Sequence, residues 1–340
     1  MMIIKDHQLK MPLPYLKIFL QHAVEENLPV ESLLADTGLT VDALSGGESS
    51  VSLGDMLFVL ARVTRLLGPG WHLALARRLT VPAHGPLGFA VVTAPDLGAA
   101  VDVMIRFIGI RTPFLWLSGA LENDWFIIRL HENTELGEQR QLMIELILLS
   151  LQNLIRRPLG RELRGARLVF DHPAPPYRER MSSAYQPDLL FAGNGNSLRL
   201  PAEWLKEPCA LHDEAMHRYL LSRCEDELHM TLGALPAEVA VRQALLASPN
   251  RLPRLSDIAA SQHVSARTLI RRLKRGNTSY QRIRDDVRKT LAVDLLLHSD
   301  LPVSRIAWRL GYQDPSNFGR AFRSWFGVSP GRFRGAGRAL

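Results

Sequence analysis

An internal repeat in the last third of the chain limits most strongly what this sequence can fold into. Residues 256–259 (SDIA) and residues 304–307 (SRIA) match at an offset of 48 positions. Beyond each match, at an offset of 49, lies a pair of large apolar residues four positions apart: Leu269 with Leu273, and Phe318 with Phe322. Residues four apart share one face of a helix. Each copy therefore predicts a short helix, a tight turn and a second helix with an apolar inner face, at about 255–275 and 303–326.

The positive charge of the chain is concentrated in the same third. Residues 1–235 hold 22 Lys and Arg against 27 Asp and Glu, a net charge of −5, whereas residues 236–340 hold 19 against 7, a net charge of +12. Such a basic segment indicates a polyanionic partner. No stretch approaches about 18 consecutive apolar residues, so the sequence predicts no membrane span. Charge and repeat together favour double-stranded DNA, because the second helix of a helix-turn-helix unit enters the major groove.

Polar side chains dominate the face of each second helix that the apolar pair leaves exposed. Arg can bind guanine and Asn can bind adenine through two hydrogen bonds, while Ser, Thr and Lys mostly contact phosphates. A solvated helix face without a partner is the alternative for any of them. The residues predicted to face DNA are Arg267, Thr268, Ile270, Arg271, Lys274 and Arg275 in the first copy, and Ser316, Asn317, Gly319, Arg320, Arg323 and Ser324 in the second.

The local signals at both copies agree with this interpretation. Ser265 is a good N-cap for the first of these helices, and Asp314 followed by Pro315 is a good start for the second. A single helix is expected between the copies, at about 279–298. At 1.5 Å per residue, roughly 20 residues span about 30 Å, close to the ~34 Å of one turn of DNA. One monomer is thus predicted to place both second helices in successive major grooves.

The first two-thirds of the chain predict a helix-rich α+β domain with a small sheet. Long apolar helices are expected at about 97–108 and 138–157, the second ended by Pro158. A β-hairpin is expected around the turn at 122–124, and further strands at 167–170 and 196–200, with residues 193–196 as another hairpin turn.

A helix at about 211–230 precedes the change in the sign of the charge. The predicted division is therefore a first domain at 1–205, a helical connector at 206–235 and an all-α DNA-binding domain at 236–340. Trp308, Trp325 and Phe326 are expected in the core of the last domain. The alternative for these aromatic residues is stacking on single-stranded bases.

Several short motifs carry a resemblance to a known family. They are 255–259 (LSDIA), 265–269 (SARTL) and above all the closing run 306–312 (IAWRLGY), 317–322 (NFGRAF) and 327–330 (GVSP). With these motifs the chain resembles the AraC/XylS transcriptional regulators. Residues 84–88 (HGPLG), 170–175 (FDHPAP) and 201–205 (PAEWL) are similar to the arabinose-operon-type N-terminal domain of one branch of that family. The similarity extends over nearly the whole chain.

The resemblance implies a function for each domain. Base contacts are implied for Arg267, Ile270 and Arg271 in the first unit, and for Pro315, Ser316, Asn317, Gly319 and Arg320 in the second. Ile270 departs from the polar residue often found at its position, so it reads a thymine methyl group or nothing. The first domain is expected to form a homodimer and to bind a small effector, and RNA polymerase is a further candidate partner.

Other chemistry finds little support in the sequence, so neither an enzyme nor a cofactor is expected. Cys209 and Cys224 are too few for a disulfide framework and lack metal-ligand spacing, and residues 1–6 do not resemble a secretory signal, so a reducing, cytoplasmic location is expected. Arg106 and Arg111 are candidates either for holding an anionic effector or for structural ion pairs. Two other hypotheses are a catalytic first domain fused to a DNA-binding module, and architectural DNA binding without sequence preference.

Overall fold

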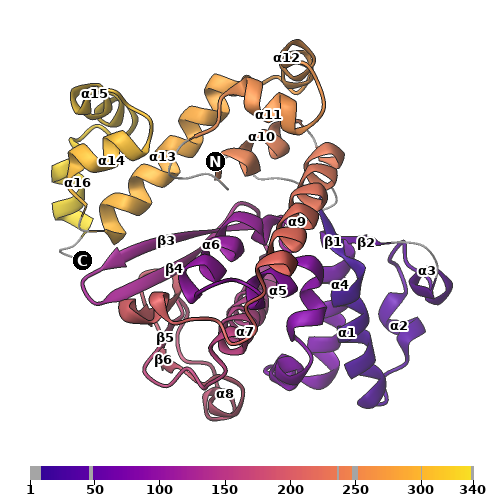
Figure 1. Ribbon diagram of the computed structural model, residues 1–340. Helices are drawn as coiled ribbons and strands as arrows, with labels where there is room; N and C mark the ends of the chain where they lie inside the picture. The colour runs from indigo at the N-terminus through magenta and orange to yellow at the C-terminus, as the bar shows by residue number, and fades with distance from the viewer. Residues whose placement is uncertain (1–8, 46–48, 236, 247–251, 300, 338–340) are drawn as a thin grey trace. The chain divides into compact units, whose positions relative to one another are not determined.

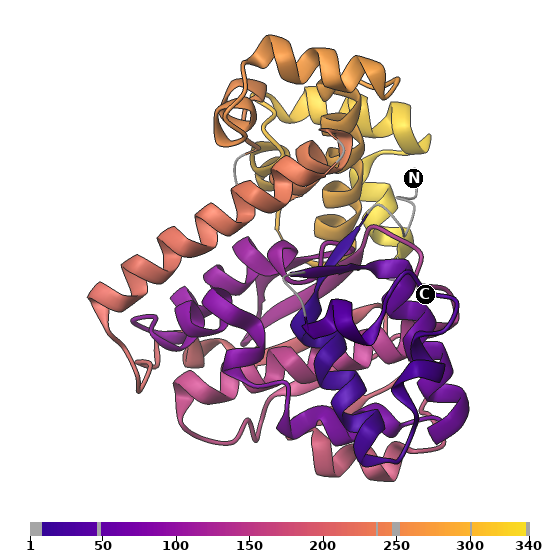
Figure 2. The ribbon, with the colours of Figure 1, turned by 90° about the vertical axis from the view of Figure 1, so that its right-hand side faces the viewer.

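The computed structural model describes residues 9–45, 49–235, 237–246, 252–299 and 301–337. The chain divides into two compact units, a first one formed by residues 2–119 and 124–228 and a second one formed by residues 120–123 and 229–340 together with residue 1. The division lies inside one long helix, α9 (Glu214–Ala234), which Figure 2 shows as a continuous ribbon. Residues 1–6 and Pro236, on which two of the expectations above rest, lie outside the described residues.

The first unit is α+β and helix-rich, which confirms the predicted fold class (Figure 1). Its helices are α1 (Leu13–Glu25), α2 (Val30–Leu34), α3 (Val41–Ser45), α4 (Leu53–Leu67), α5 (Gly85–Val92), α6 (Leu97–Phe107), α7 (Arg140–Leu159) and α8 (Arg178–Ala184). The 3-10 segments are η2 (Trp71–Arg77), η3 (Val81–His84), η4 (Ile108–Ile110), η5 (Gly137–Gln139) and η6 (Ala202–Lys206). A small two-stranded sheet joins β1 (Lys10–Pro12) to β2 (Ser50–Ser52).

The larger sheet has five strands in the order β3-β4-β7-β5-β6. They are β3 (Leu115–Glu122), β4 (Trp125–Glu132), β5 (Arg167–Val169), β6 (Asp188–Leu190) and β7 (Asn196–Pro201). The predicted β3–β4 hairpin is confirmed, with Asn123 at a positive φ of 50° in its turn. The expectation of a hairpin turn at 193–196 was wrong, because β5 lies between β6 and β7 and pairs with both.

Helix α7 forms the centre of the first unit. Thirteen of its residues are buried, among them two polar ones, Glu145 and Gln152. Pro158 does not end this helix as expected, since it lies within the last turn. The helix ends instead at Gly160, whose φ of 64° is the left-handed conformation that glycine adopts without steric strain.

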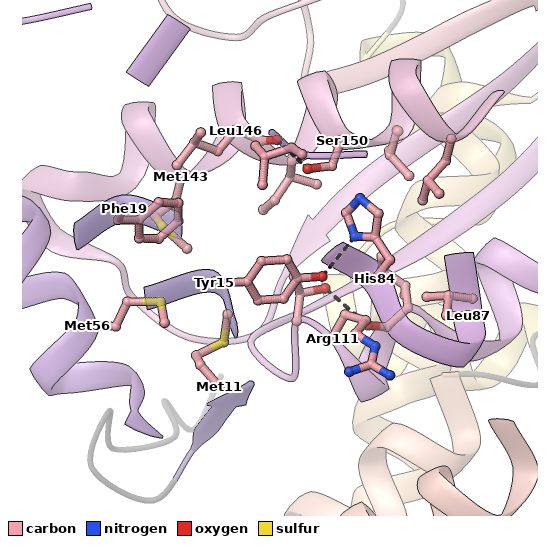
Figure 3. Close-up of a pocket in the computed structure, with 16 residues that line it drawn as sticks. Met11, Tyr15, Phe19, Met56, His84, Leu87, Arg111, Met143, Leu146 and Ser150 are labelled. Atoms are coloured by element: carbon pink, nitrogen blue, oxygen red, sulfur yellow. Dashed lines mark hydrogen bonds between the residues drawn. The ribbon is translucent and has the colours of Figure 1, made fainter. Parts of the chain in front are cut away.

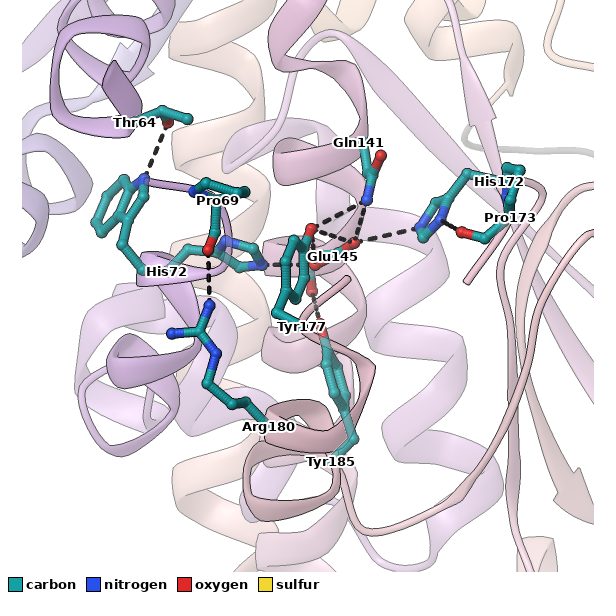
Figure 4. A network of polar contacts seen from close by, with 11 residues as sticks. Thr64, Pro69, His72, Gln141, Glu145, His172, Pro173, Tyr177, Arg180 and Tyr185 are labelled. Carbon is teal, nitrogen blue, oxygen red and sulfur yellow. Dashed lines mark hydrogen bonds and ion pairs between the residues drawn. The ribbon is translucent and has the colours of Figure 1, made fainter. Parts of the chain in front are cut away.

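A buried polar network ties α7 to the segments around it (Figure 4). The carboxylate of Glu145 lies 2.6 Å from Nε2 of His72 and accepts a hydrogen bond from the hydroxyl of Tyr177 at 3.0 Å. Nε2 of His172 lies 3.3 Å from the same carboxylate, and the hydroxyl of Tyr185 donates to the Glu145 backbone carbonyl at 2.7 Å. Burial raises the pKa of Glu145, but the hydrogen bonds from His172 and His72 outweigh it and lower that pKa to about 2. The carboxylate is thus held ionised in the protein interior.

From residue 229 onward the described residues of the second unit form helices and no strand, as predicted. Its helices after α9 are α10 (Ala237–Leu246), α11 (Leu255–Ser261), α12 (Ala266–Arg275), α13 (Tyr280–His298), α14 (Val303–Arg309), α15 (Pro315–Phe326) and α16 (Pro330–Gly337). The two apolar pairs of the repeat are buried: Leu269 and Leu273 in α12, and Phe318 and Phe322 in α15. No helix among the described residues of either unit is long and apolar enough to cross a membrane.

The aromatic core of the second unit differs from the expectation at three residues. Trp308 is 63% exposed and Phe326 is 36% exposed, while Trp325 is half-buried. The prediction that Trp308 belongs to the core was wrong. Helix α14 is short, and its buried residues are Ile306 and Ala307. Trp308 is turned by about 100° around the helix axis from Ala307 and faces outward.

Candidate nucleic-acid interface

Helix α12 presents a basic face opposite its apolar pair. The Ser265 hydroxyl accepts a hydrogen bond from the backbone N–H of Thr268 at 3.1 Å, which confirms the predicted N-cap. Thr268 itself is half-buried, and its hydroxyl lies 2.9 Å from that of Ser265. The exposed side chains of the helix are Arg267, Ile270, Arg271, Arg272, Lys274 and Arg275. Arg272 is the one exposed cation that the sequence analysis left out, because it lies at the edge of the outer face.

Helix α15 presents a smaller and less charged face. The Asp314 carboxylate accepts a hydrogen bond from the backbone N–H of Ser316 at 2.8 Å, and Pro315 occupies the first helical position, half-buried. Ser316, Asn317, Arg320, Arg323 and Ser324 are exposed, whereas Gly319 is half-buried. An Arg320 Nη2 donates to the Asn317 side-chain carbonyl at 2.5 Å. These two side chains are therefore already oriented together on the helix surface.

Most cations of these two faces have no acidic partner. Within the described part of the chain, no carboxylate lies within ion-pair distance of the guanidinium or ammonium groups of Arg267, Arg271, Lys274, Arg275 and Arg323. By contrast, Arg242 and Arg288 on other helices of the unit lie within 4.0 Å of an Asp or Glu. The positive charge is thus left free on the two helices that the repeat predicts to contact DNA.

Helix α13 holds the two helix-turn-helix units at its opposite ends (Figure 1). Near its start, the Tyr280 hydroxyl donates to the Pro253 carbonyl at 2.7 Å, next to α11. Further along, the Arg288 guanidinium donates to the carbonyls of Leu310 and Gly311, at 2.9 and 3.3 Å, at the turn of the second unit. Its 19 residues span about 28 Å at 1.5 Å each. Both helix-turn-helix units are therefore attached to one helix, the first at the residues before α11 and the second at its turn.

A cavity lies in the first unit, and Arg111 is the one effector candidate named from the sequence that lines it (Figure 3). Its lining comes from segments far apart in the chain, including α1, η3, η4 and α7. No sequence motif spans them, so no sequence signal could have found the cavity. Arg111 lines it, and this side chain also forms an ion pair with Glu227 of α9 at 2.7 Å. Arg106, the other arginine considered above, pairs with Glu225 at 2.7 Å outside the cavity.

The two cysteines show no sign of reactivity. Both are buried and unpaired. Burial raises the pKa of Cys209 to about 11 and that of Cys224 to about 12. Thiols with such pKa values are protonated at neutral pH, whereas nucleophilic cysteines have lowered ones. Among the described residues, no cluster of His, Cys, Asp and Glu is arranged to hold a metal ion.

Comparison with known proteins agrees with both units. Residues 28–209 match the family model of the arabinose-binding N-terminal domain of AraC transcription regulators, and residues 258–336 match a helix-turn-helix domain. The chain is 30% identical over 330 residues, 96% of either chain, to the ornithine utilization regulator of Pseudomonas aeruginosa. It is 25% identical over 261 residues to the regulator VqsM of the same organism, covering 74% of this chain and 79% of VqsM.

Among solved structures, the crystal structure of the transcriptional regulator CdpR from Pseudomonas aeruginosa matches with a TM-score of 0.48 and 21% identity, covering 94% of this chain and 98% of that one. The family models and the relatives are regulators and not enzymes, which agrees with the unreactive thiols. The match of residues 28–209 to the AraC N-terminal domain, the matched helix-turn-helix domain and the 30% identity over 96% of the chain show that this chain belongs to the AraC family of DNA-binding transcriptional regulators.

Proposed function

We propose that α12 and α15 of one monomer enter successive major grooves on one side of an operator. The observation that carries this proposal is the placement of two unpaired basic helix faces at the ends of one helix. That helix spans about 28 Å, and successive major grooves on one face of DNA are about 34 Å apart. Residues 236–340 are then the DNA-binding domain, residues 206–235 the connector and residues 1–205 the regulatory domain.

The exposed residues of the two helices divide into two roles. Arg267, Ile270 and Arg271 of α12, and Ser316, Asn317 and Arg320 of α15, are assigned to bases, because they lie in the first two turns of their helices, which approach the groove most closely. Lys274, Arg275 and Arg323 lie in the last turns and are assigned to phosphates. Thr268 and Pro315, both half-buried, are assigned to the edge of the groove.

Selection of binding sites from a random DNA pool, followed by gel-shift titration, tests this function. Arg271→Ala and Arg320→Ala are expected to weaken binding to the selected site by at least about fivefold, since a good base contact contributes about 1–3 kcal/mol of discrimination. Arg164→Ala, which removes an exposed arginine of the first unit, is the matched control and should bind as the wild type does. Selection that yields no consensus would favour architectural binding, and unchanged affinity of both variants would refute the assignment.

The regulatory domain is proposed to form a homodimer and to respond to a small effector. The support is the match of residues 28–209 to the arabinose-binding domain of AraC regulators and the cavity inside the same unit. A relative that regulates ornithine utilization makes an amino acid one candidate effector. Analytical ultracentrifugation of the full chain, with and without DNA, tests the dimer.

A regulator acts where the chromosome lies, so we place the protein in the cytoplasm, with RNA polymerase as the partner at the promoter.

A further inference from the structure

The cavity of the first unit is lined almost entirely by apolar side chains (Figure 3). Three methionines line it, Met11, Met56 and Met143, together with Phe19 and the aliphatic residues of α7. The volume of the cavity is about 570 Å³ when the solvent at its open mouth is included. Methionine side chains are flexible, so the cavity can widen around a ligand larger than the present space.

One corner of the cavity is polar and incompletely hydrogen-bonded. The Tyr15 hydroxyl lies 2.9 Å from Nδ1 of His84. His84 has one more polar neighbour, the Leu79 backbone, which acts to raise the pKa of the ring, but its buried Nε2 makes no hydrogen bond of ordinary geometry among the described residues. The same holds for Nε of Arg111, whose residue is 7% exposed. Buried polar groups are nearly always hydrogen-bonded, so two unpaired ones beside a cavity indicate a missing partner.

Both groups at this corner are suited to donate. Burial and the neighbouring Arg111 guanidinium lower the pKa of His84 to about 4, so the ring is neutral at pH 7. The Tyr15 hydroxyl has no other hydrogen bond among the described residues, so we assign it as the donor to Nδ1, which leaves the ring hydrogen on Nε2. The two hydroxyls of the lining, Thr112 and Ser150, donate to backbone carbonyls of their own segments. The cavity therefore offers two hydrogen-bond donors without a partner of ordinary geometry, Nε2 of His84 and Nε of Arg111, and the second belongs to a cation.

Arg111 also connects this corner to α9. Its Nη2 donates to Glu227 of that helix at 2.7 Å. Gly85 makes room for the guanidinium: its φ is +56°, and a Cβ at this position would lie 2.7 Å from Nη2 of Arg111. Helix α9 continues from Glu227 into the second unit. A ligand that takes hydrogen bonds from Arg111 thus acts on the helix that leads to the DNA-binding domain.

We propose that this cavity binds a small carboxylic acid with an apolar tail, whose carboxylate accepts hydrogen bonds from Arg111 and His84 and competes with Glu227 for Arg111. The proposal rests on the effector response proposed above and names its ligand class and its first contact. The charge of the lining supports an acid, because none of the sixteen lining residues is Asp or Glu. An amine or a dibasic amino acid finds no partner for its ammonium group there, and a sugar finds too few polar groups.

A matched series of ligands tests the class. Hexanoate, 1-hexanol and hexylamine share a skeleton of six carbons and differ in the polar group at its end, and L-lysine serves as the dibasic control. We expect calorimetry with the full chain to show hexanoate binding at least about tenfold more tightly than 1-hexanol, since hydrogen bonds to charged groups are the stronger ones. Hexylamine and L-lysine should not bind. Equal binding of all three six-carbon compounds, or no binding of hexanoate, would overturn the proposal.

A separate variant tests whether the ligand competes with Glu227 for Arg111. Arg111→Met leaves a buried site disturbed and risks misfolding, so Glu227→Gln is the better change, because it keeps the shape and removes the competing charge. We expect about tenfold tighter binding of hexanoate to this variant. Glu225→Gln, which breaks the exposed pair with Arg106 outside the cavity, should leave the affinity unchanged. Equal affinity of the wild type and Glu227→Gln would contradict the competition.

Gel shifts with the same proteins separate this inference from the proposed function. If the selected DNA site is bound specifically but hexanoate is not bound, the ligand class is wrong and the DNA-binding function stands. If hexanoate is bound but Arg271→Ala and Arg320→Ala bind the site as the wild type does, the assignment of the recognition helices is wrong and the cavity stands. When the wild type binds both its DNA site and hexanoate, hexanoate should change the affinity of the wild type for the DNA site more than it changes that of Glu227→Gln.

Discussion

Nε2 of His72 lies 2.6 Å from Oε2 of Glu145, and both side chains are buried, at 1% and 0% exposure. Seventy-three positions separate the two residues in the chain. The pair joins η2 to the central helix α7, while Tyr177 and His172 bring a third segment to the same carboxylate. A single acidic side chain therefore connects segments of the first unit that lie far apart in the sequence.

We expect Glu145→Gln to lower the free energy of unfolding by about 2–3 kcal/mol. The hydrogen bonds to a charged carboxylate are replaced by weaker ones to a neutral amide, and one donor of the network then lies opposite the amide NH₂ group, which cannot accept its hydrogen bond. Urea unfolding of the full chain, followed by circular dichroism, measures this change. Glu138→Gln is the matched control, because Glu138 is exposed in the turn before α7. A loss below about 0.5 kcal/mol, the usual effect of a surface substitution, would show that the network contributes nothing to stability.

The stabilisation from Glu145 should depend on pH. Its pKa is about 2 in the folded protein, below the value of about 4.3 of an unperturbed Glu. A lowered pKa means that the stabilisation is fully present above about pH 4.3 and is lost as the pH falls toward 2, by about 3 kcal/mol in all. Unfolding curves between pH 7 and pH 2 should show the wild type approaching Glu145→Gln at the acid end. A constant difference between the two proteins over this range would contradict the low pKa.

Arg320→Lys should separate base recognition from charge. Arg320 reaches over Asn317, and its planar guanidinium can form two hydrogen bonds to one base, which the ammonium of Lys cannot. We expect a loss of about 1–3 kcal/mol on the preferred site and relaxed preference at one base pair. Arg323→Ala should instead weaken binding equally on all sequences and reduce the slope of the salt dependence by about one. If Arg320→Lys kept the preference for that base pair, Arg320 would not be a base-reading residue.

Trp308→Ala should have little effect on stability. The side chain is 63% exposed, so its removal leaves no cavity in the core. We expect a change within about 0.5 kcal/mol, against a loss of about 3–5 kcal/mol for Phe322→Ala, whose ring is fully buried. Thermal unfolding followed by circular dichroism compares the two variants. Equal losses in both would place Trp308 in the core after all.

The sequence by itself determined most of the second unit. Caps such as Ser265 and Asp314 and apolar pairs such as Leu269 with Leu273 act within a few residues of one another, so their effect can be read along the chain. The offset of the repeat predicts the positions of both α12 and α15. The same local logic failed at Trp308, because a short helix turns only two of its residues inward.

The tertiary structure alone decided how the first unit is built and where its cavity lies. The insertion of β5 between β6 and β7, and the pair of His72 with Glu145, depend on residues that meet only after folding. The ion pair of Arg111 with Glu227 joins positions 116 apart. Such contacts follow from which surfaces pack together, and packing depends on the whole chain, whereas helix caps and apolar spacing depend on the next few residues.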